Sequence, residues 1–386
     1  MCLSFSGGDF SMGIYGRNFQ PSNLPVSALS HVYYAFMNIH ANGTVFSGDT
    51  YADLEKHYPG DSWNDPGANA YGCVNQLYQL KKKNRHLKSI LSIGGATWSA
   101  NYPAAASSDA TRKAFSQSAV GFMKDWGFDG IDIDWEYPAS EAEANDLTLL
   151  LQALRQELDM YSTQHGSGHH FLLSMAAPAN PVHISKLNIK EISHIVDYIN
   201  LMAYDYSGSW DKVTGYVANI GFKSTNMNAT RFATETALKA YVDGGAPVSK
   251  IVLGLPTYGR AFEQTDGIGM PFTGIGQGIW EEGVWDYKVL PKQNAHVFCD
   301  YEVRGCYSFD PKAKELISFD TSQIVSSKVA WLRREGLAGS IFWEASGDRS
   351  DEDSLIATSY HALSAIDDSS NQLEYPDSMY DNIRAA

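Results

Sequence analysis

The sequence predicts an α/β protein, a (β/α)8 barrel with a small α+β insertion domain before its last strand. Short apolar runs alternate with longer runs of helical periodicity along most of the chain, which is typical of a parallel sheet with crossover helices. The alternation breaks once, between Arg260 and about Thr321, where glycines and aromatic residues cluster. The chain has 386 residues, more than the roughly 250 to 300 at which a single core usually stops growing, so a large barrel with an insertion, or several domains, is expected.

Seven strands of the barrel follow from the apolar runs. They are expected at His31–Ile39, Lys88–Ile93, Phe128–Asp134, Phe171–Ala176, Tyr198–Tyr204, Lys250–Pro256 and Ala338–Trp343. An eighth strand is needed to close the barrel, and we expect it before Tyr15. The available segment, Leu3–Phe10, is a poor strand sequence because it contains Gly7, Gly8 and Asp9.

Two of the connecting segments carry apolar residues at helical spacing, which gives each helix one face to lay on the sheet. These residues are Phe115, Ala119, Phe122 and Met123 in one segment and Leu147, Leu150, Leu151, Leu154 and Leu158 in the other. The irregular segment is too long for a structureless loop, so it is predicted to form a small antiparallel sheet, after which a helix at Asp320–Glu335 returns the chain to the barrel. The expected domains are therefore 1–260 and 322–386 for the barrel and 261–321 for the insertion.

Composition excludes several classes of partner. Lys and Arg number 29 and Asp and Glu 44, giving a net charge of −15 that repels phosphate backbones and anionic membranes. No apolar run approaches the ~18 residues that span a bilayer; the run Ile251–Pro256 is strand-sized. We expect no nucleic-acid and no membrane partner.

The cysteines and the N-terminal residues bear on the cellular compartment in which the protein is found. Cys299 and Cys306 lie close in sequence and could either cross-link a hairpin or remain thiols in neighbouring strands, and the sequence leaves both open; Cys73 is expected in the core. Met1–Gly13 has no basic start followed by an apolar run, so no signal peptide is expected. The sequons that begin at Asn42 and Asn228 have meaning only in a secreted chain.

The most informative stretch, Phe128–Pro138, reads FDGIDIDWEYP. Because side chains alternate along a strand, Asp132, Asp134 and Glu136 share one face while the intervening apolar residues point to the other. Carboxylates roughly 7 Å apart inside a barrel raise one another's pKa, as acid–base chemistry requires. Two other interpretations are an acidic face turned to solvent, which is disfavoured because helices cover the strands of a parallel barrel, and a Mg²⁺ or Mn²⁺ site.

Asp129, Asp132, Asp134 and Glu136 match the DxxDxDxE signature of family 18 glycoside hydrolases, the chitinase family, which the chain resembles from about Gly13 to its C-terminus. Four further segments resemble this family in the same order, and a fifth, Gly16-Arg17-Asn18-Phe19, is most similar to secreted fungal chitinases of about this size. The four are Ser92-Ile93-Gly94-Gly95, Met202-Ala203-Tyr204-Asp205, Pro256-Thr257-Tyr258-Gly259-Arg260 and Trp343-Glu344.

The resemblance implies a catalytic apparatus at the C-terminal ends of the barrel strands, with no metal and no other cofactor. Glu136 is the implied general acid, and Asp134 is implied to hold the substrate's acetamido N–H and, by its charge, to help keep Glu136 protonated. Asp132 is implied to share a proton or a hydrogen bond with Asp134, and Tyr204 to donate its hydroxyl to the acetamido oxygen. That oxygen would be the nucleophile, giving an oxazolinium ion and net retention.

The implied substrate-binding residues are Asp205, Met202, Trp343, Arg260, Trp210, Tyr258, Tyr15 and Phe36. Trp343 resembles the aromatic floor under the sugar, and Trp210 a wall of the leaving-side subsites. The chain departs from the family at Ala96, where Trp is usual, which puts leaving-side binding in doubt. The resemblance also implies non-proline cis peptide bonds at Ala35–Phe36, Glu136–Tyr137 and Trp343–Glu344.

The predicted function is hydrolysis of β-1,4-linked N-acetylglucosamine polymers or oligomers by an extracellular monomer. One alternative is an inactive chitin-binding lectin of the same fold, which would normally lack the acid that Glu136 supplies. A metal-dependent hydrolase is a second, but no His pair or Cys cluster accompanies the carboxylates. An endo-β-N-acetylglucosaminidase is the third, and only the insertion and the groove-wall tryptophans weigh against it.

Overall fold

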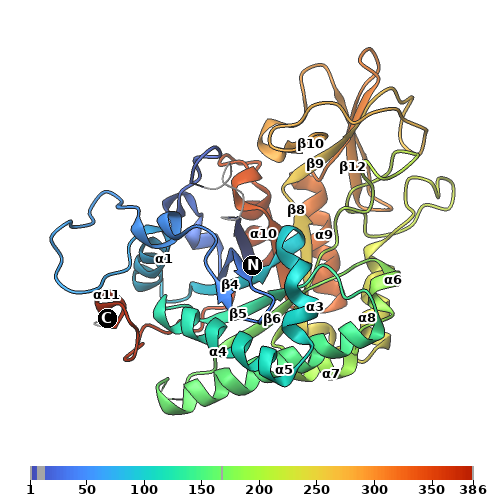
Figure 1. The fold of residues 1–386 in the computed structure, drawn as a ribbon. Coiled ribbons are helices and arrows are strands. Elements are labelled where there is room, and N and C mark those ends of the chain that lie inside the picture. Colours follow the sequence, from blue (N-terminus) through green and yellow to red (C-terminus); the bar gives the residue numbers. More distant parts are fainter. Residues whose placement is uncertain (1, 7–13, 167, 385–386) are drawn as a thin grey trace. The chain divides into compact units, whose positions relative to one another are not determined.

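The computed structural model describes residues 2–6, 14–166 and 168–384 (Figure 1). By its internal contacts the chain divides into two compact units, and each is described by itself. The first unit comprises Cys2–Ala177, Ser185–Ile199 and Ile366–Ala386, and the second comprises Pro178–Ile184 and Asn200–Ala365.

The first unit contains five strands that pair in parallel in the order β1–β2–β4–β5–β6. Their bounds are Cys2–Ser6 for β1, His31–Ile39 for β2, Lys88–Gly94 for β4, Gly130–Asp134 for β5 and Leu172–Ala177 for β6. A short strand, β3 at Val45–Phe46, pairs antiparallel with β2. The register of β4, β5 and β6 aligns Ser92, Asp132 and Ser174 in one row across the sheet.

Helices follow the strands of the first unit. They are α1 (Gly72–Lys83), α2 (Gly95–Trp98), α3 (Tyr102–Ala106), α4 (Asp109–Asp125), α5 (Glu141–Gln164), α7 (Ile189–Ile195) and α11 (Asp381–Arg384). The long helices begin at serine caps, since Ser108 Oγ accepts the Thr111 N–H and Ser140 Oγ accepts the Glu143 N–H. All five leucines that predicted an apolar stripe on α5 are buried, as are three of the four residues on α4.

The second unit combines parallel strands with an antiparallel sheet. Strands β8 (Ile251–Pro256) and β14 (Gly339–Trp343) pair in parallel, with helices α6 (Pro181–Ile184), α8 (Thr234–Asp243), α9 (Ser322–Glu335) and α10 (Leu355–Leu363) in the same unit. Strand β7 (Tyr198–Leu201) begins in the first unit and ends in the second.

The segment in which the strand and helix alternation breaks forms the predicted antiparallel sheet. Its five strands lie in the order β10–β9–β13–β12–β11. They span Tyr258–Phe262 (β9), Val284–Asp286 (β10), His296–Asp300 (β11), Gly305–Asp310 (β12) and Glu315–Ser318 (β13). The division of the chain at 260 and 321 stays a prediction.

Three strands differ from their predicted bounds. Strand β7 stops at Leu201 and not at Tyr204, because the chain turns there: the Ala203 N–H donates to the Leu201 carbonyl at 2.8 Å, and Asp205 has a φ of 59°. Strand β5 ends at Asp134 as predicted but begins at Gly130 and not at Phe128, and Glu136 follows its end. Strand β1 covers Cys2–Ser6, while the rest of the predicted first strand, and Met12, fall outside the described residues.

The structure decides between the two interpretations of the cysteine pair. Cys299 and Cys306 form a disulfide bond between paired positions of β11 and β12. Cys73 is a buried free cysteine, as predicted. Among the described residues no helix is both long and apolar enough to cross a membrane.

Candidate active site

Asp132 is held by hydroxyl groups from both neighbouring strands. Ser92 Oγ on β4 donates to Asp132 Oδ2 at 2.8 Å, and Ser174 Oγ on β6 donates to Oδ1 at 2.6 Å. The parallel register that places the three residues in one row explains both contacts. The apolar residues that alternate with the carboxylates, Ile131, Ile133 and Trp135, are buried as predicted. The position of the Asp132 carboxylate is therefore fixed before any substrate binds.

Asp134 is a buried acid with unused hydrogen-bonding capacity. Its side chain is 7% exposed, and its Oδ1 has no hydrogen-bond partner among the described residues. Burial, followed by the charges of Glu136 and Asp132, raises the pKa of Asp134 well above its usual value. A buried acceptor without a partner costs free energy in the empty protein, and a ligand that supplies an N–H donor removes this cost.

Glu136 is anchored through its backbone. Its N–H donates to Ser99 Oγ at 2.8 Å, and the Ser99 hydroxyl lies 2.9 Å from the Gly95 carbonyl. The peptide bond that follows Glu136 is cis, as are Ala35–Phe36 and Trp343–Glu344, so all three bonds predicted to be cis are confirmed.

Gly94, the last residue of β4, and Gly95, the first residue of α2, leave no room for side chains. A Cβ at Gly94, which has a φ of 107°, would lie 2.2 Å from the Asp134 carbonyl oxygen. A Cβ at Gly95, which has a φ of 78°, would lie 2.6 Å from the Phe36 ring. Phe36 thus packs against the turn that follows β4, in the same unit as the three carboxylates.

Ala96, the departure from the family pattern, is exposed. The ring of Trp98, two residues later, packs over Gly48, where an added Cβ would lie 2.4 Å from the Trp98 ring. Trp98 is therefore already engaged with its own unit.

In the second unit, Asp205 and Arg260 form a two-point ion pair. Arg260 Nε donates to Asp205 Oδ1 at 2.6 Å, and a terminal guanidinium nitrogen donates to Oδ2 at 2.8 Å. The Tyr258 hydroxyl also donates to Oδ1, at 2.7 Å. The two parallel hydrogen bonds hold the Arg260 and Asp205 side chains in one mutual orientation, because the planar guanidinium matches both carboxylate oxygens.

The predicted aromatic residues of the second unit gather around the same ion pair. The Arg260 guanidinium carbon lies 4.9 Å from the centre of the Trp210 ring, which is 58% exposed. Tyr204 and Trp343 both pack against the buried cluster that contains Tyr258. The second unit therefore holds these predicted residues in mutual contact, with half-buried Met202 beside Ala203 on the turn after β7.

Tyr15 lies in the first unit and is 39% exposed. Its hydroxyl donates to Asp49 Oδ2 at 2.8 Å and not to a residue of the carboxylate strand.

Sequence reasoning missed three residues of these two groups. Ser174 and Ser99 position Asp132 and Glu136, and Glu281 Oε1 lies 3.9 Å from a guanidinium nitrogen of Arg260. A signal existed only for Ser174, because parallel pairing of the predicted strands would align it with Asp132.

A metal site was one interpretation of the carboxylates. In the part of the chain that the structure describes, no group of three His, Cys, Asp or Glu side chains is placed to hold a metal ion. The expectation of metal-independent chemistry remains a prediction, which chelation tests.

The sequence is similar to known proteins over nearly the whole chain. Residues 11–348 match the family described as Glycosyl hydrolases family 18. The chain is 62% identical over 372 residues to Chitinase 1 of Aphanocladium album, covering 96% of this chain and 88% of that protein. It is 57% identical to Endochitinase 1 of Metarhizium robertsii with the same coverage.

Among solved structures, the catalytic domain of psychrophilic chitinase B from Arthrobacter TAD20 matches with a TM-score of 0.86 at 27% identity over 96% of each chain. Chitinase ChiA74 from Bacillus thuringiensis matches with a TM-score of 0.84 at 29% identity, covering 94% of this chain and 69% of that one.

These similarities confirm the predicted (β/α)8 barrel with a second small sheet, and they confirm that the protein is a glycoside hydrolase. The chain belongs to glycosyl hydrolase family 18.

Proposed function

We propose that this protein is a retaining chitinase, which hydrolyses β-1,4 bonds between N-acetylglucosamine units through an oxazolinium intermediate. The observation that carries the mechanism is the buried Asp134, whose Oδ1 has no partner in the described chain, two residues before Glu136. An acceptor of this kind suits the N–H of an acetamido group. The names of the relatives at 62% and 57% identity support the same substrate class.

The first step breaks the glycosidic bond. The Glu136 carboxyl donates its proton to the glycosidic oxygen, the bond from that oxygen to the anomeric carbon breaks, and the shortened sugar leaves as an alcohol. The acetamido carbonyl oxygen of the substrate bonds to the anomeric carbon and forms the oxazolinium ring. In the second step the Glu136 carboxylate accepts a proton from water, whose oxygen opens the ring from the side of the departed sugar. Two inversions give net retention.

Asp134 and Asp132 support this chemistry electrostatically. Asp134 accepts the acetamido N–H and stabilises the positive charge that develops on the ring. Asp132, held by Ser92 and Ser174, shares a proton or a hydrogen bond with Asp134.

The second unit contributes substrate binding in this proposal. Tyr204 donates its hydroxyl to the acetamido oxygen and holds it for attack. Asp205 and Arg260 bind sugar hydroxyls, with their directions set by the two-point ion pair and by Tyr258. The remaining predicted contacts are Trp343 under the cleaved sugar, Trp210 on the leaving side, and Met202, Tyr15 and Phe36.

We further propose that the protein acts outside the cell as a monomer. The fungal relatives and the predicted resemblance to secreted chitinases support the location, and the disulfide bond Cys299–Cys306 fits an oxidising compartment.

The proposal is tested by following the hydrolysis of chitotetraose by proton NMR during the first minutes, with and without EDTA. We expect the new reducing ends to appear as the β-anomer above its equilibrium share, at the same rate in both samples. An initial excess of the α-anomer would contradict retention. A loss of activity in EDTA that Mg²⁺ or Mn²⁺ restores would establish the metal-dependent alternative, and binding without products would establish the lectin.

A further inference from the structure

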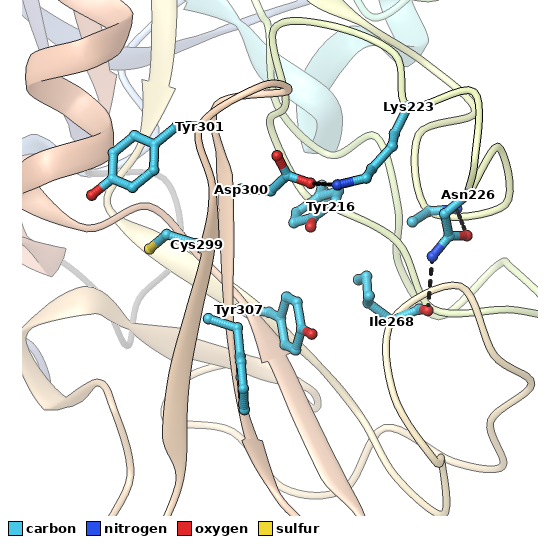
Figure 2. A pocket seen from close by; sticks show the side chains of 10 residues that line it. Tyr216, Lys223, Asn226, Ile268, Cys299, Asp300, Tyr301 and Tyr307 are labelled. Carbon is cyan, nitrogen blue, oxygen red and sulfur yellow. Dashed lines mark hydrogen bonds and ion pairs between the residues drawn. The ribbon is translucent and has the colours of Figure 1, made fainter.

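A cavity of about 420 Å³ lies within the second unit, on the antiparallel sheet, and none of its residues is among the predicted site residues (Figure 2). It lies between the hairpin of β11 and β12 and the loop that precedes α8. Its lining consists of Tyr216, Lys223, Asn226, Ala229, Ile268, Phe298, Cys299, Asp300, Tyr301 and Tyr307. The size falls within the range of pockets that bind small molecules.

One wall of the cavity is aromatic. The rings of Phe298 and Tyr307 stack with centroids 5.3 Å apart, and the Tyr216 ring lies 6.1 Å from that of Tyr307. Phe298 is 46% exposed, whereas Tyr216 and Ala229 belong to a buried cluster behind the wall. The wall therefore presents apolar ring surface to solvent while its base is packed and rigid.

Another part of the lining is polar, and its charges largely cancel. Lys223 forms a direct ion pair with Asp300 in the lining of the cavity (Figure 2). Asn226 Nδ2 donates to the Ile268 carbonyl at 3.2 Å, which fixes the orientation of its amide. An ammonium, a carboxylate and an amide in one wall offer donors and acceptors without a surplus of positive charge.

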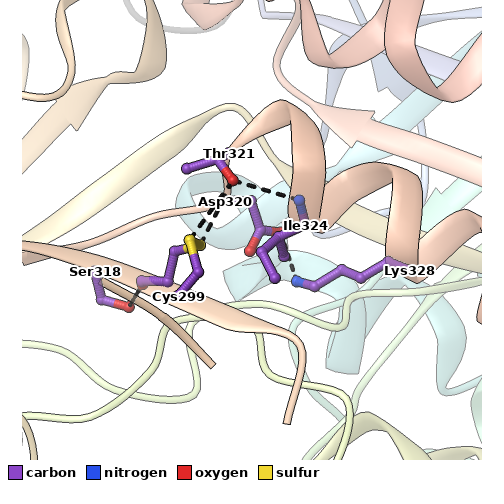
Figure 3. The surroundings of a disulfide bond; sticks show 7 residues. Cys299, Ser318, Asp320, Thr321, Ile324 and Lys328 are labelled. Carbon is purple, nitrogen blue, oxygen red and sulfur yellow. Dashed lines mark hydrogen bonds and ion pairs between the residues drawn. A yellow bond between two sulfur atoms is a disulfide. The ribbon is translucent and has the colours of Figure 1, made fainter. Parts of the chain in front are cut away.

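The hairpin that carries much of the lining is held rigidly. A disulfide bond joins Cys299 to Cys306 (Figure 3). In the sequence Cys299 stands between Phe298 and Asp300, which both line the cavity. The sulfur atoms of the disulfide lie beside the Thr321 hydroxyl, which accepts the Ile324 N–H at the start of α9. Gly305, the first residue of β12, lets the hairpin pack closely on Tyr216, since a Cβ there would lie 2.6 Å from the Tyr216 ring. A pocket that is ordered before binding loses less entropy when a ligand enters.

We propose that this cavity is a second saccharide site that binds an N-acetylglucosamine unit of a chitin chain. A pyranose presents an apolar C–H face to stacked rings and hydroxyl and amide groups at its edges, and the two walls supply these two kinds of partner. The neutral ion pair disfavours a phosphate or another anion, because Lys223, the cation in the described lining, is already paired with Asp300. The proposal rests on the proposed function for its choice of sugar.

The rim of the cavity also carries the sequon Asn228-Ala229-Thr230. Asn228 is exposed, and Lys223, Asn226 and Ala229 of the same loop line the cavity. A glycan on Asn228 could occupy or cover the pocket, so the test uses the Asn228→Gln background throughout.

Binding is measured by calorimetric titration of chitohexaose into the Glu136→Gln/Asn228→Gln protein. We expect two classes of site. Phe298→Ala should weaken one class at least tenfold and leave the affinity of the other within twofold. Val297→Ala is the matched control, because Val297 is a similarly exposed neighbour on β11 that does not line the cavity. Lys223→Gln, which breaks the ion pair at the surface, should weaken the same class.

Turnover supplies the second readout, in the catalytically active Asn228→Gln protein. Phe298→Ala should reduce the hydrolysis of insoluble chitin severalfold and leave kcat/KM on chitotetraose unchanged. A single class of site, or two classes that Phe298→Ala does not alter, would overturn the second site while the hydrolysis of chitotetraose still supports the proposed function. If no chito-oligosaccharide is bound or hydrolysed, the proposed function itself fails.

Discussion

Lys81 and Asp129 form a buried ion pair, with Lys81 Nζ 2.7 Å from Asp129 Oδ2 and both side chains 1% exposed. Asp129 Oδ2 also accepts the Ser89 N–H at 2.7 Å, and Oδ1 accepts the Gln372 N–H at 2.8 Å. The first aspartate of the DxxDxDxE signature therefore joins α1, β4 and the C-terminal segment within the first unit. Its contacts are structural, and the proposed mechanism uses the other three carboxylates.

Replacing Asp129 by Asn should destabilise the protein strongly. The change leaves the Lys81 ammonium buried without its counter-charge, and loss of one partner of such a pair costs about 3 to 5 kcal/mol. The measurement is urea unfolding at pH 7, with kcat on chitotetraose recorded for the folded variant. The double variant Lys81→Met/Asp129→Asn is the control and should recover part of the loss. Full stability of Asp129→Asn would contradict this role.

Asp205→Asn should weaken substrate binding because it removes the charge that orients Arg260. Charge-assisted two-point contacts are worth about 1.5 to 3 kcal/mol, so KM for chitotetraose is expected to rise roughly tenfold or more. Tyr258→Phe removes only the third contact to Asp205 and should have a smaller effect. Equal KM values for Asp205→Asn and the wild type would show that Arg260 is positioned without its partner.

Asp53 gives the protein a pH-dependent stability. Burial raises its pKa to about 6, although Ser47 and Tyr34 donate hydrogen bonds to it. An unfolded Asp titrates near 3.9, so between about pH 4 and pH 6 the native state binds more protons and stability falls as pH rises. The expected loss is about 3 kcal/mol over this window.

Urea unfolding at pH 4, 5, 6 and 7 checks this prediction. Asp53→Asn should flatten the profile, so that its stability relative to the wild type improves steadily up to about pH 6. Parallel profiles for the two proteins would mean that Asp53 does not titrate in this window.

Ala96→Trp should strengthen leaving-side binding. Ala96 is exposed, and Trp98 packs over Gly48, so a new indole is not expected to displace a core side chain. Stacking on an added aromatic ring is worth about 1 to 3 kcal/mol. Oligomer affinity and the share of transglycosylation products should both rise, with little change in stability. If both match the wild type, the groove already compensates for the missing ring.

Much of the fold could be predicted because periodicity is a local property. Strand β2 matches its predicted bounds, and the buried leucines of α5 follow from spacing alone. The end of β7 could not be predicted, because the turn at Leu201 depends on a backbone hydrogen bond and on the positive φ of Asp205. Cross-linking of Cys299 and Cys306 depends on the pairing of β11 with β12, which the sequence leaves open.

The candidate site also contains residues that could be predicted from the sequence and residues that could not. Asp132, Asp134 and Glu136 could be predicted as site residues because a motif places them two residues apart. Ser99 could not, since its contact with the Glu136 N–H depends on how the chain folds after β4. The cavity that contains Lys223 and Tyr307 also could not, because its residues are spread from 216 to 307 and form no motif.

The central claim is that Glu136 is the proton donor, and turnover of chitotetraose by Glu136→Gln tests it most directly. Gln preserves the shape of the side chain and removes the acidic proton, so the variant should fold and bind oligomers like the wild type. Its kcat should fall by about 10² to 10⁴ or more, the range expected for loss of a general acid. A folded Glu136→Gln protein that retains near wild-type turnover would contradict the proposed mechanism.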